Sequence, residues 1–132
     1  MSALDRRVVK PRPVYLDLVR IRLPIPGIVS ILHRVSGALL FLFGLPLLLF
    51  AVQRSLGAPE SVAGLWAVLG HPLVKLATIG FLWAYLHHFC AGIRYLLIDL
   101  HLCDELAPAR RSSVIVMIVS VALTLIVGVR LW

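Results

Sequence analysis

The sequence has few charged residues, and acidic residues are especially rare. Only 14% of its 132 residues are charged, and only six are aspartate or glutamate. Soluble domains carry about a quarter of their residues as charged side chains, so this composition excludes an ordinary soluble globular protein. The chain is also too short to contain several independent domains.

Cysteine is equally scarce. The two cysteines, Cys90 and Cys103, form no C-x-x-C pair and no C-x-x-C-H motif. Their spacing therefore gives no support to a paired-cysteine metal site or to a covalently attached c-type haem. The first 20 residues are charged and contain proline, so they lack the apolar stretch of a secretory signal, and we expect no cleaved signal peptide.

Apolar residues dominate what is present, at 61% of the chain and a mean hydropathy of +0.99. A membrane-spanning helix needs about 20 apolar residues, and the apolar runs predict three such helices, over about residues 28–52, 72–98 and 114–131. We therefore expect an all-α membrane protein with an N-terminal arm (1–27) and a three-helix transmembrane domain (28–132). Three helices enclose little space, which favours a cofactor or active site completed by a partner chain.

The charges are unevenly distributed along the chain. The net charge is +7, and six basic residues precede the first predicted span: Arg6, Arg7, Lys10, Arg12, Arg20 and Arg22. Such a bias holds the N-terminus of a membrane protein in the cytoplasm, so three spans place the C-terminus on the outer side of the membrane. Because no nucleic-acid-binding motif is present, the basic residues indicate contact with lipid and not with nucleic acid.

Proline and polar residues divide the chain between the apolar runs. Pro46 predicts a bend or loosened turns in the first span. Residues 53–71 are expected to form an outer loop, with a short interfacial helix over 61–69 that places Trp66 at the level of the headgroups. Residues 101–113 are expected to form a polar cytoplasmic loop. The last span is almost entirely valine, isoleucine and leucine, which predicts a wall of the bundle.

The second span carries ionisable side chains deep in an apolar run, where they are costly and usually functional. His88 lies about ten residues, or roughly 15 Å, from the predicted cytoplasmic end, near the middle of the hydrocarbon. Helical geometry places four residues along one stripe of the helix: His88, Gly92, Tyr95 and Asp99. His87 and Arg94 lie on a neighbouring stripe. An imidazole one turn from a glycine offers a ligand atom with space beside it for a flat cofactor such as haem. A histidine–aspartate pair packed between helices is the structural alternative.

A haem held by two histidines needs a second ligand besides His88. His87 does not suit that role, because consecutive residues of a helix point about 100° apart. The second ligand is therefore expected from another chain, which places the haem between subunits. Taken by itself, His87 is explained equally well as a packed, hydrogen-bonded histidine or as a ligand, and the sequence leaves both interpretations open.

The start of the first span has a polar face. Ser30, His33, Arg34 and Gly37 lie within an arc of about 100°. His33 and Arg34 are suited to pair with haem propionates. Ser30, Arg34 and Asp99 supply a hydroxyl, a guanidinium and a carboxylate that could hold a quinone carbonyl and pass protons to it. Snorkelling of Arg34 toward the headgroups, and a structural Arg34–Asp99 pair between helices, are the alternatives.

Two sequence motifs lie on or near the first two spans. The first is Arg12-Pro13 followed by Ser30-Ile31-Leu32-His33-Arg34-Val35-Ser36-Gly37, and the second is His88 followed by Gly92-Ile93-Arg94 and Leu96-Leu97-Ile98-Asp99. Over about residues 10–132 the chain resembles the cytochrome b556 membrane-anchor family of succinate dehydrogenase (succinate:quinone oxidoreductase, respiratory Complex II). This family provides the larger of the enzyme's two small anchors.

The resemblance implies roles for individual residues. His88 matches the family's axial haem ligand, and His33 and Arg34 match positions near the haem propionates. Ser30 and Arg34 match positions that line the ubiquinone pocket, and Asp99 matches the acid that closes the second motif. The chain departs from the family at Tyr95, where a histidine is usual, and His87 is not part of the motif.

The resemblance also implies a four-subunit enzyme. A flavoprotein would oxidise succinate and an iron–sulfur protein would relay the electrons. This chain and a second anchor subunit would hold one haem b between them and reduce ubiquinone at the cytoplasmic face, with the N-terminal arm docked on the iron–sulfur subunit. The chain itself has no catalytic residues for oxidising succinate. An anchor of a fumarate reductase, and a purely structural anchor without haem, are the alternatives.

Overall fold

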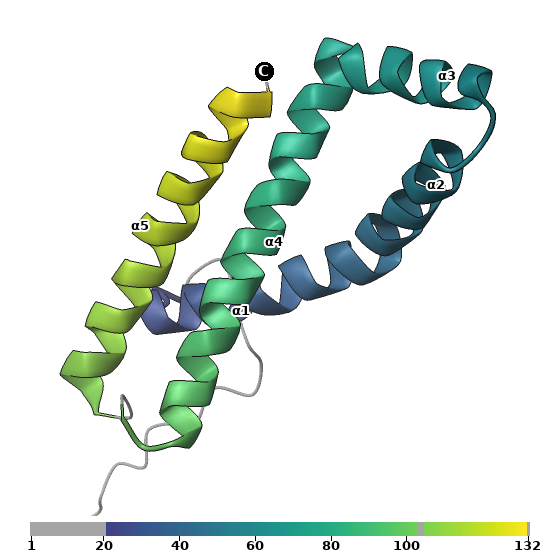
Figure 1. Ribbon diagram of the computed structural model, residues 1–132. Coiled ribbons are helices and arrows are strands. Elements are labelled where there is room, and N and C mark those ends of the chain that lie inside the picture. The colour runs from purple at the N-terminus through teal and green to yellow at the C-terminus, as the bar shows by residue number, and fades with distance from the viewer. Residues whose placement is uncertain (1–20, 103–104, 132) are drawn as a thin grey trace, which may run out of the picture.

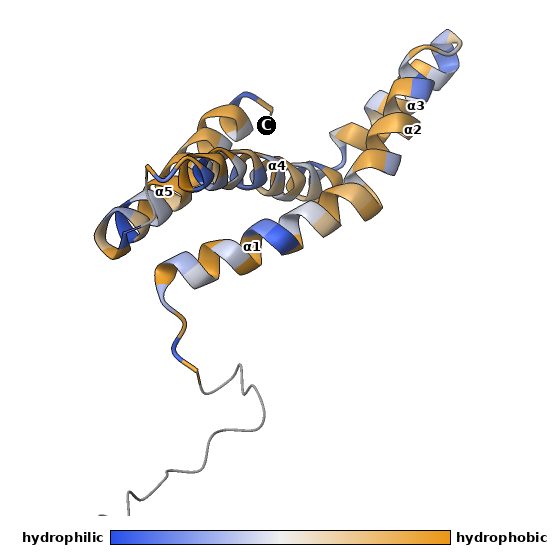
Figure 2. Ribbon diagram, turned by 90° about the horizontal axis from the view of Figure 1, so that it is seen from below, coloured by the Kyte–Doolittle hydropathy of each residue, from blue (hydrophilic) through white to orange (hydrophobic). Residues whose placement is uncertain are grey.

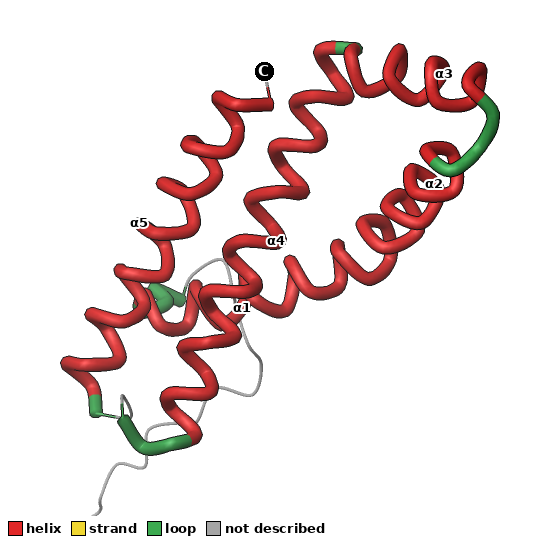
Figure 3. The backbone as a smooth tube through the Cα atoms, viewed as in Figure 1, coloured by secondary structure: helices red, strands yellow, loops and turns green. Residues whose placement is uncertain are grey.

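The structure is a computed structural model that describes residues 21–102 and 105–131 (Figure 1). Within these residues every regular element is helical (Figure 3): α1 (Ile25–Leu39), the π-helix η1 (Leu40–Gly44), α2 (Leu45–Ser55), α3 (Pro59–Gly70), α4 (Pro72–Asp99) and α5 (Leu106–Leu131). The predicted all-α class is confirmed for this part of the chain. Most of the predicted N-terminal arm, with Arg12-Pro13, and Cys103 lie outside the described residues.

Three helical segments are long and apolar enough to cross a membrane: Ile25–Ser55, Pro72–Asp99 and Leu106–Leu131. They contain the three predicted spans and extend each of them, so the prediction of three spans is confirmed. The orientation across the membrane stays a prediction from the charge distribution.

The first span changes direction between α1 and α2 (Figure 1). Pro46 lies in the first turn of α2, directly after the π-helix, where the N–H of Leu45 bonds to the carbonyl of Leu40. A proline has no N–H to donate, and its ring clashes with the carbonyl four residues earlier. The wider π turn accommodates both effects without ending the helix, so the bend predicted from Pro46 is present and lies one turn before the proline.

The connections between spans contain more helix than the sequence predicts. The short helix expected over residues 61–69 is α3, which runs from Pro59 to Gly70. The loop predicted over 101–113 is wrong beyond residue 105, because α5 begins at Leu106. Proline is tolerated in a first turn. The hydroxyls of Ser112 and Ser113, in the second turn, both donate to the carbonyl of Ala109 in the same helix, so the polar sequence is compatible with helix.

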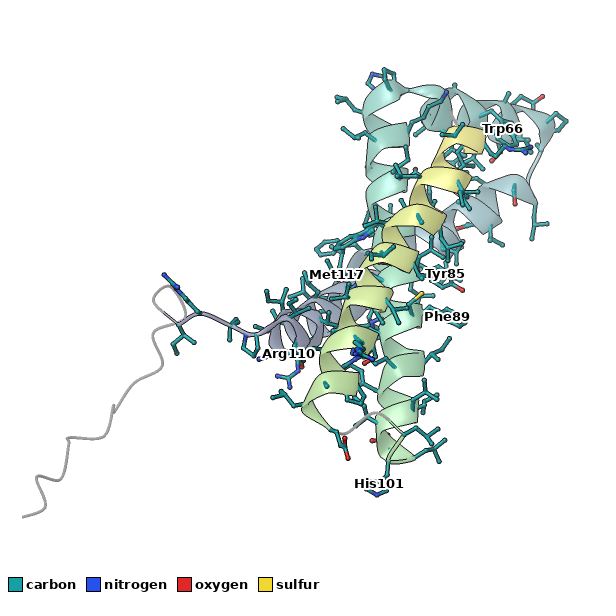
Figure 4. All side chains as sticks on the ribbon, turned by 90° about the vertical axis from the view of Figure 1, so that its left-hand side faces the viewer. Trp66, Tyr85, Phe89, His101, Arg110 and Met117 are labelled. Atoms are coloured by element: carbon teal, nitrogen blue, oxygen red, sulfur yellow. The ribbon has the colours of Figure 1, made fainter. Side chains whose placement is uncertain are left out.

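Helix α4 is the central element of the bundle (Figure 1). Helix α5 runs antiparallel beside it, and α1 crosses α4 and also contacts α5. Beyond the crossing, α2 diverges from α4, and α3 joins the end of α2 to the start of α4. Figure 2 shows apolar residues along most of the helices, and many of the large apolar side chains are exposed. The side chains of Tyr85 and Phe89 point away from the bundle (Figure 4), with 56% of each residue exposed. Such a surface suits lipid or partner helices.

Small side chains line the interface between α4 and α5. Ala84 and Ala91 on α4, and Ser120, Thr124 and Gly128 on α5, are all buried. The hydroxyls of the two α5 residues donate to backbone carbonyls of α5 itself. Small residues let helices approach closely in a membrane, and the internal hydrogen bonds leave these hydroxyls satisfied.

Candidate functional site

The imidazole of His88 lies against α1, at the crossing of α1 and α4. Its Nδ1 is 3.0 Å from the backbone carbonyl oxygen of His33 and 3.2 Å from the Oγ of Ser36. A carbonyl oxygen accepts hydrogen bonds and cannot donate them, so Nδ1 carries the proton and donates it to His33. Nε2 is then the unprotonated nitrogen. No hydrogen bond to Nε2 forms within residues 21–102 and 105–131.

This arrangement fits a metal-bound histidine. Histidine ligands of metals commonly donate their other ring N–H to a backbone carbonyl, which determines the tautomer and the ring orientation. The bond from His88 to His33 does this within a single chain. The described residues contain no cluster of three or more metal-binding side chains, so they give no support to a metal site built from this chain's side chains alone.

Gly37 allows the close approach of α1 to the His88 ring. A Cβ at Gly37 would lie 2.7 Å from Cε1 of His88 and 3.2 Å from its Nδ1. The first distance is far below the van der Waals separation of two carbons, so any larger residue would displace the ring. Gly37 was expected on the polar face of the first span, but no role was predicted for Ser36. The spacing of Ser36, three residues after His33, was the available signal for its contact with the His33 carbonyl.

The ring of His33 covers one face of the His88 ring. The ring centroids are 4.1 Å apart and the planes are inclined by 7°. The ring of His33 also borders Gly92, where a Cβ would come within 3.9 Å of its Nε2. The space expected beside Gly92 for a cofactor therefore lies next to the side chain of His33. The two histidines predicted to serve a haem are thus brought together by the fold.

An apolar groove lies beside this cluster, between α1 and α4. Its volume is about 280 Å³. Its walls are Val35, Ser36 and Leu39 on α1 and Trp83 and Ala84 on α4, with further residues of the same helices. Ser36, which contacts His88, is therefore also a groove residue. A flat apolar cofactor needs such a surface next to its ligand.

His87 points into the chain's own interior. The residue is fully buried, and its ring stacks on Trp83 with centroids 5.3 Å apart. Neither ring nitrogen has a hydrogen-bond partner within the described residues. Its complete burial, with the backbone of Val29 on α1 close to the ring, favours the packed interpretation of His87 over the ligand interpretation.

Arg94 and Tyr95 continue this interior toward the end of α4. Arg94 is only 4% exposed and bonds to the first turns of α5. The ring of Tyr95 lies 5.1 Å from the ring of His33, and its hydroxyl is buried without a hydrogen-bond partner in the described part of the chain. The bond from Arg94 to α5 was not predicted from the sequence, although an arginine within an apolar helix signals a buried partner.

The three residues predicted to bind quinone lie on two helices. Ser30 is half-buried on α1, Arg34 is exposed on α1, and Asp99 is the exposed last residue of α4. No ion pair joins Arg34 to Asp99 in the part of the chain that the structure describes. The structural Arg34–Asp99 ion pair that the sequence left open as an alternative is therefore not formed in these residues.

The sequence is similar to known membrane subunits over almost its whole length. Residues 9–127 match a protein family described as "Succinate dehydrogenase/Fumarate reductase transmembrane subunit". The succinate dehydrogenase cytochrome b556 subunit of Coxiella burnetii (strain RSA 493 / Nine Mile phase I) is 38% identical over 122 residues, which cover 92% of this chain and 97% of that protein. The family match includes every residue of the site described above.

Proposed function

Because the chain belongs to the succinate dehydrogenase/fumarate reductase transmembrane-subunit family, we propose that His88 is an axial ligand of one haem b and that the chain forms part of a ubiquinone-reduction site. As a family member, it is a membrane-anchor subunit of the succinate dehydrogenase complex with three candidate spans. The observation that supports the haem proposal most directly is the His88 Nδ1 bond to the carbonyl of His33, at 3.0 Å.

The chain's own residues would prepare the haem site in several ways. The carbonyl of His33 holds the His88 ring in the tautomer that presents a bare Nε2. His33 and Arg34 supply positive or polarisable groups for the propionates. The apolar groove beside Ser36 would offer an apolar surface to the macrocycle. A bound haem would supply a one-electron redox centre in the membrane.

The second haem ligand would come from the second anchor subunit. His87 is buried within this chain, and the ring of His33 stacks parallel to the His88 ring, so neither histidine is placed to bind the same iron from the opposite side. The remaining partners in the proposal are an iron–sulfur subunit, on which the N-terminal arm docks, and a flavoprotein that oxidises succinate. The complex would lie in a bacterial inner membrane, with the N-terminus of this chain in the cytoplasm.

Quinone binding is proposed for Ser30, Arg34 and Asp99. The hydroxyl of Ser30 would donate a hydrogen bond to a quinone carbonyl, and the guanidinium of Arg34 would stabilise negative charge that develops there. Asp99 would accept or return protons at the membrane boundary. The absence of an Arg34–Asp99 ion pair in the described part of the chain supports this assignment, because it leaves both groups available to a ligand.

The haem proposal is tested by a reduced-minus-oxidised difference spectrum of the complex purified through this chain. We expect a b-type absorption band that is lost or shifted in His88→Ala and retained in His71→Ala, which changes an exposed histidine at the start of α4. A complex that assembles and shows no such band would favour the haem-free structural anchor. An unchanged band in His88→Ala would remove the ligand assignment.

The direction of the reaction needs a separate test. Comparing succinate oxidation with fumarate reduction by the purified complex, using ubiquinone and a low-potential quinone, separates a succinate dehydrogenase from a fumarate reductase. We expect succinate–ubiquinone activity to be the larger. Greater fumarate reduction with the low-potential quinone would favour the alternative anchor.

A further inference from the structure

We propose that Ser36 and Gly37 are positioning residues for the haem ligand, and that the Ser36 hydroxyl lowers the reduction potential of the haem through His88. This inference rests on the proposed haem ligation by His88 and extends it to two residues of α1. Both residues lie directly against the imidazole: the Ser36 oxygen is 3.2 Å from Nδ1, and a Cβ at Gly37 would lie 2.7 Å from Cε1 and 3.7 Å from Nε2.

Ser36 is part of a three-atom arrangement around Nδ1 of His88. The Ser36 hydroxyl donates to the carbonyl of His33 at 3.0 Å, and its oxygen lies 3.2 Å from Nδ1. Since the serine proton is used on His33, the serine oxygen presents lone pairs to the Nδ1 proton. The Nδ1–H of His88 therefore has two acceptors, the His33 carbonyl and the Ser36 oxygen.

Two acceptors on Nδ1–H have an electronic consequence. Acceptors on the outer nitrogen raise the basicity of the imidazole, so more electron density reaches a metal bound at Nε2. Greater donation favours the oxidised iron and lowers the reduction potential. Ser36 is only 3% exposed, so little solvent competes with its oxygen for the Nδ1 proton.

Gly37 has a steric role beside this electronic one. A Cβ at this position would be 2.7 Å from Cε1 of His88, so the ring must move when the glycine is replaced. Movement of the ring would lengthen the bond from Nδ1 to His33 and would turn Nε2 away from its present direction. Gly64 on α3 has open space around it, with nothing within 4 Å of the position that a Cβ would take, and provides a matched control.

The test uses the assembled complex, with haem content, the midpoint potential and the electron paramagnetic resonance signal of the oxidised haem as readouts. The side chains introduced by Ser36→Val and Ser36→Thr have nearly the same shape, and only the threonine carries a hydroxyl. We expect Ser36→Val to raise the midpoint potential and Ser36→Thr to keep it near the wild-type value. Ser120→Ala removes a serine that is equally buried and bonded to its own helix, and should leave the potential unchanged.

Gly37→Ala should lower the haem content of the assembled complex or shift the resonance signal, whereas Gly64→Ala should do neither. Equal potentials in Ser36→Val and Ser36→Thr, or a lower potential in Ser36→Val, would overturn the role of Ser36. Wild-type haem content and resonance in Gly37→Ala would overturn the role of Gly37. Failure of the haem proposal itself would give a different result: the wild-type complex would lack the b-type band, or His88→Ala would retain it.

Discussion

The Nε of Arg94 on α4 donates a hydrogen bond to the Oγ of Ser112 on α5 at 3.0 Å. A second bond runs from Nη2 of Arg94 to the carbonyl oxygen of Ala109 at 3.3 Å. The guanidinium carbon also lies 5.4 Å from the centre of the Tyr95 ring. A buried arginine thus connects the last turns of α4 to the first turns of α5, on the same side of the bundle as His33.

This connection predicts that Arg94→Ala destabilises the contact between α4 and α5. Hydrogen bonds from a charged group contribute about 1.5–3 kcal/mol, so we expect the free energy of unfolding to fall by about that amount. Titration of the purified complex with sodium dodecyl sulfate, followed by circular dichroism, measures the change. Arg110→Ala, at an exposed arginine of α5, is the control. Equal stability of the two variants would contradict the proposed connection.

Replacing His87 with an apolar residue is predicted to increase the stability of the protein. Its ring is fully buried, and neither nitrogen meets the geometry of a hydrogen bond within the described residues, although the Val29 backbone lies close enough to interact weakly with the ring. An unsatisfied buried polar group costs about 1–3 kcal/mol, and phenylalanine fills a similar space without polar atoms. We therefore expect His87→Phe to raise the detergent unfolding midpoint and to leave the b-type band in place. A loss of the band with normal assembly would mean that His87 serves the haem after all.

The quinone proposal predicts a separation of two activities. Ser30→Ala and Arg34→Leu should lower succinate–ubiquinone reductase activity by about tenfold or more, since each removes a group worth at least about 1.4 kcal/mol to the bound quinone. Electron transfer from succinate to a soluble dye should stay unchanged, because it does not need the quinone site. Arg54→Leu, at the far end of the first span, is the control. Equal loss of both activities would indicate failed assembly.

The close packing of α4 and α5 predicts a strong effect at Gly128. A Cβ there would lie 3.8 Å from Ile79, which is ordinary contact, so Gly128→Ala should be tolerated. A leucine would extend into Ile79, and overpacking of this kind costs about 1–3 kcal/mol. We expect Gly128→Leu to lower the detergent unfolding midpoint well below that of Gly128→Ala. Similar midpoints for the two variants would show that the helices separate easily at this level.

Part of the site could be predicted from the sequence because it depends on one helix at a time. The depth of His88 follows from its distance to the end of the apolar run, and the shared face of Ser30, His33 and Arg34 follows from helical periodicity. The role of Ser36 could not be predicted in this way. Its oxygen contacts His88, which lies on another helix 52 residues later in the chain. That contact depends on where α1 crosses α4.

Hydropathy and proline placement by themselves determined the number of spans, their order and the bend near Pro46, because lipid requires every spanning backbone to satisfy its hydrogen bonds within a helix. They did not determine where α5 begins or which of two adjacent histidines is buried. Those features depend on helix packing: His87 and His88 differ by about 100° around α4. The positions of α1 and α5 fully bury the ring of His87, whereas His88 stays half-buried and bonds through Nδ1 to the carbonyl of His33.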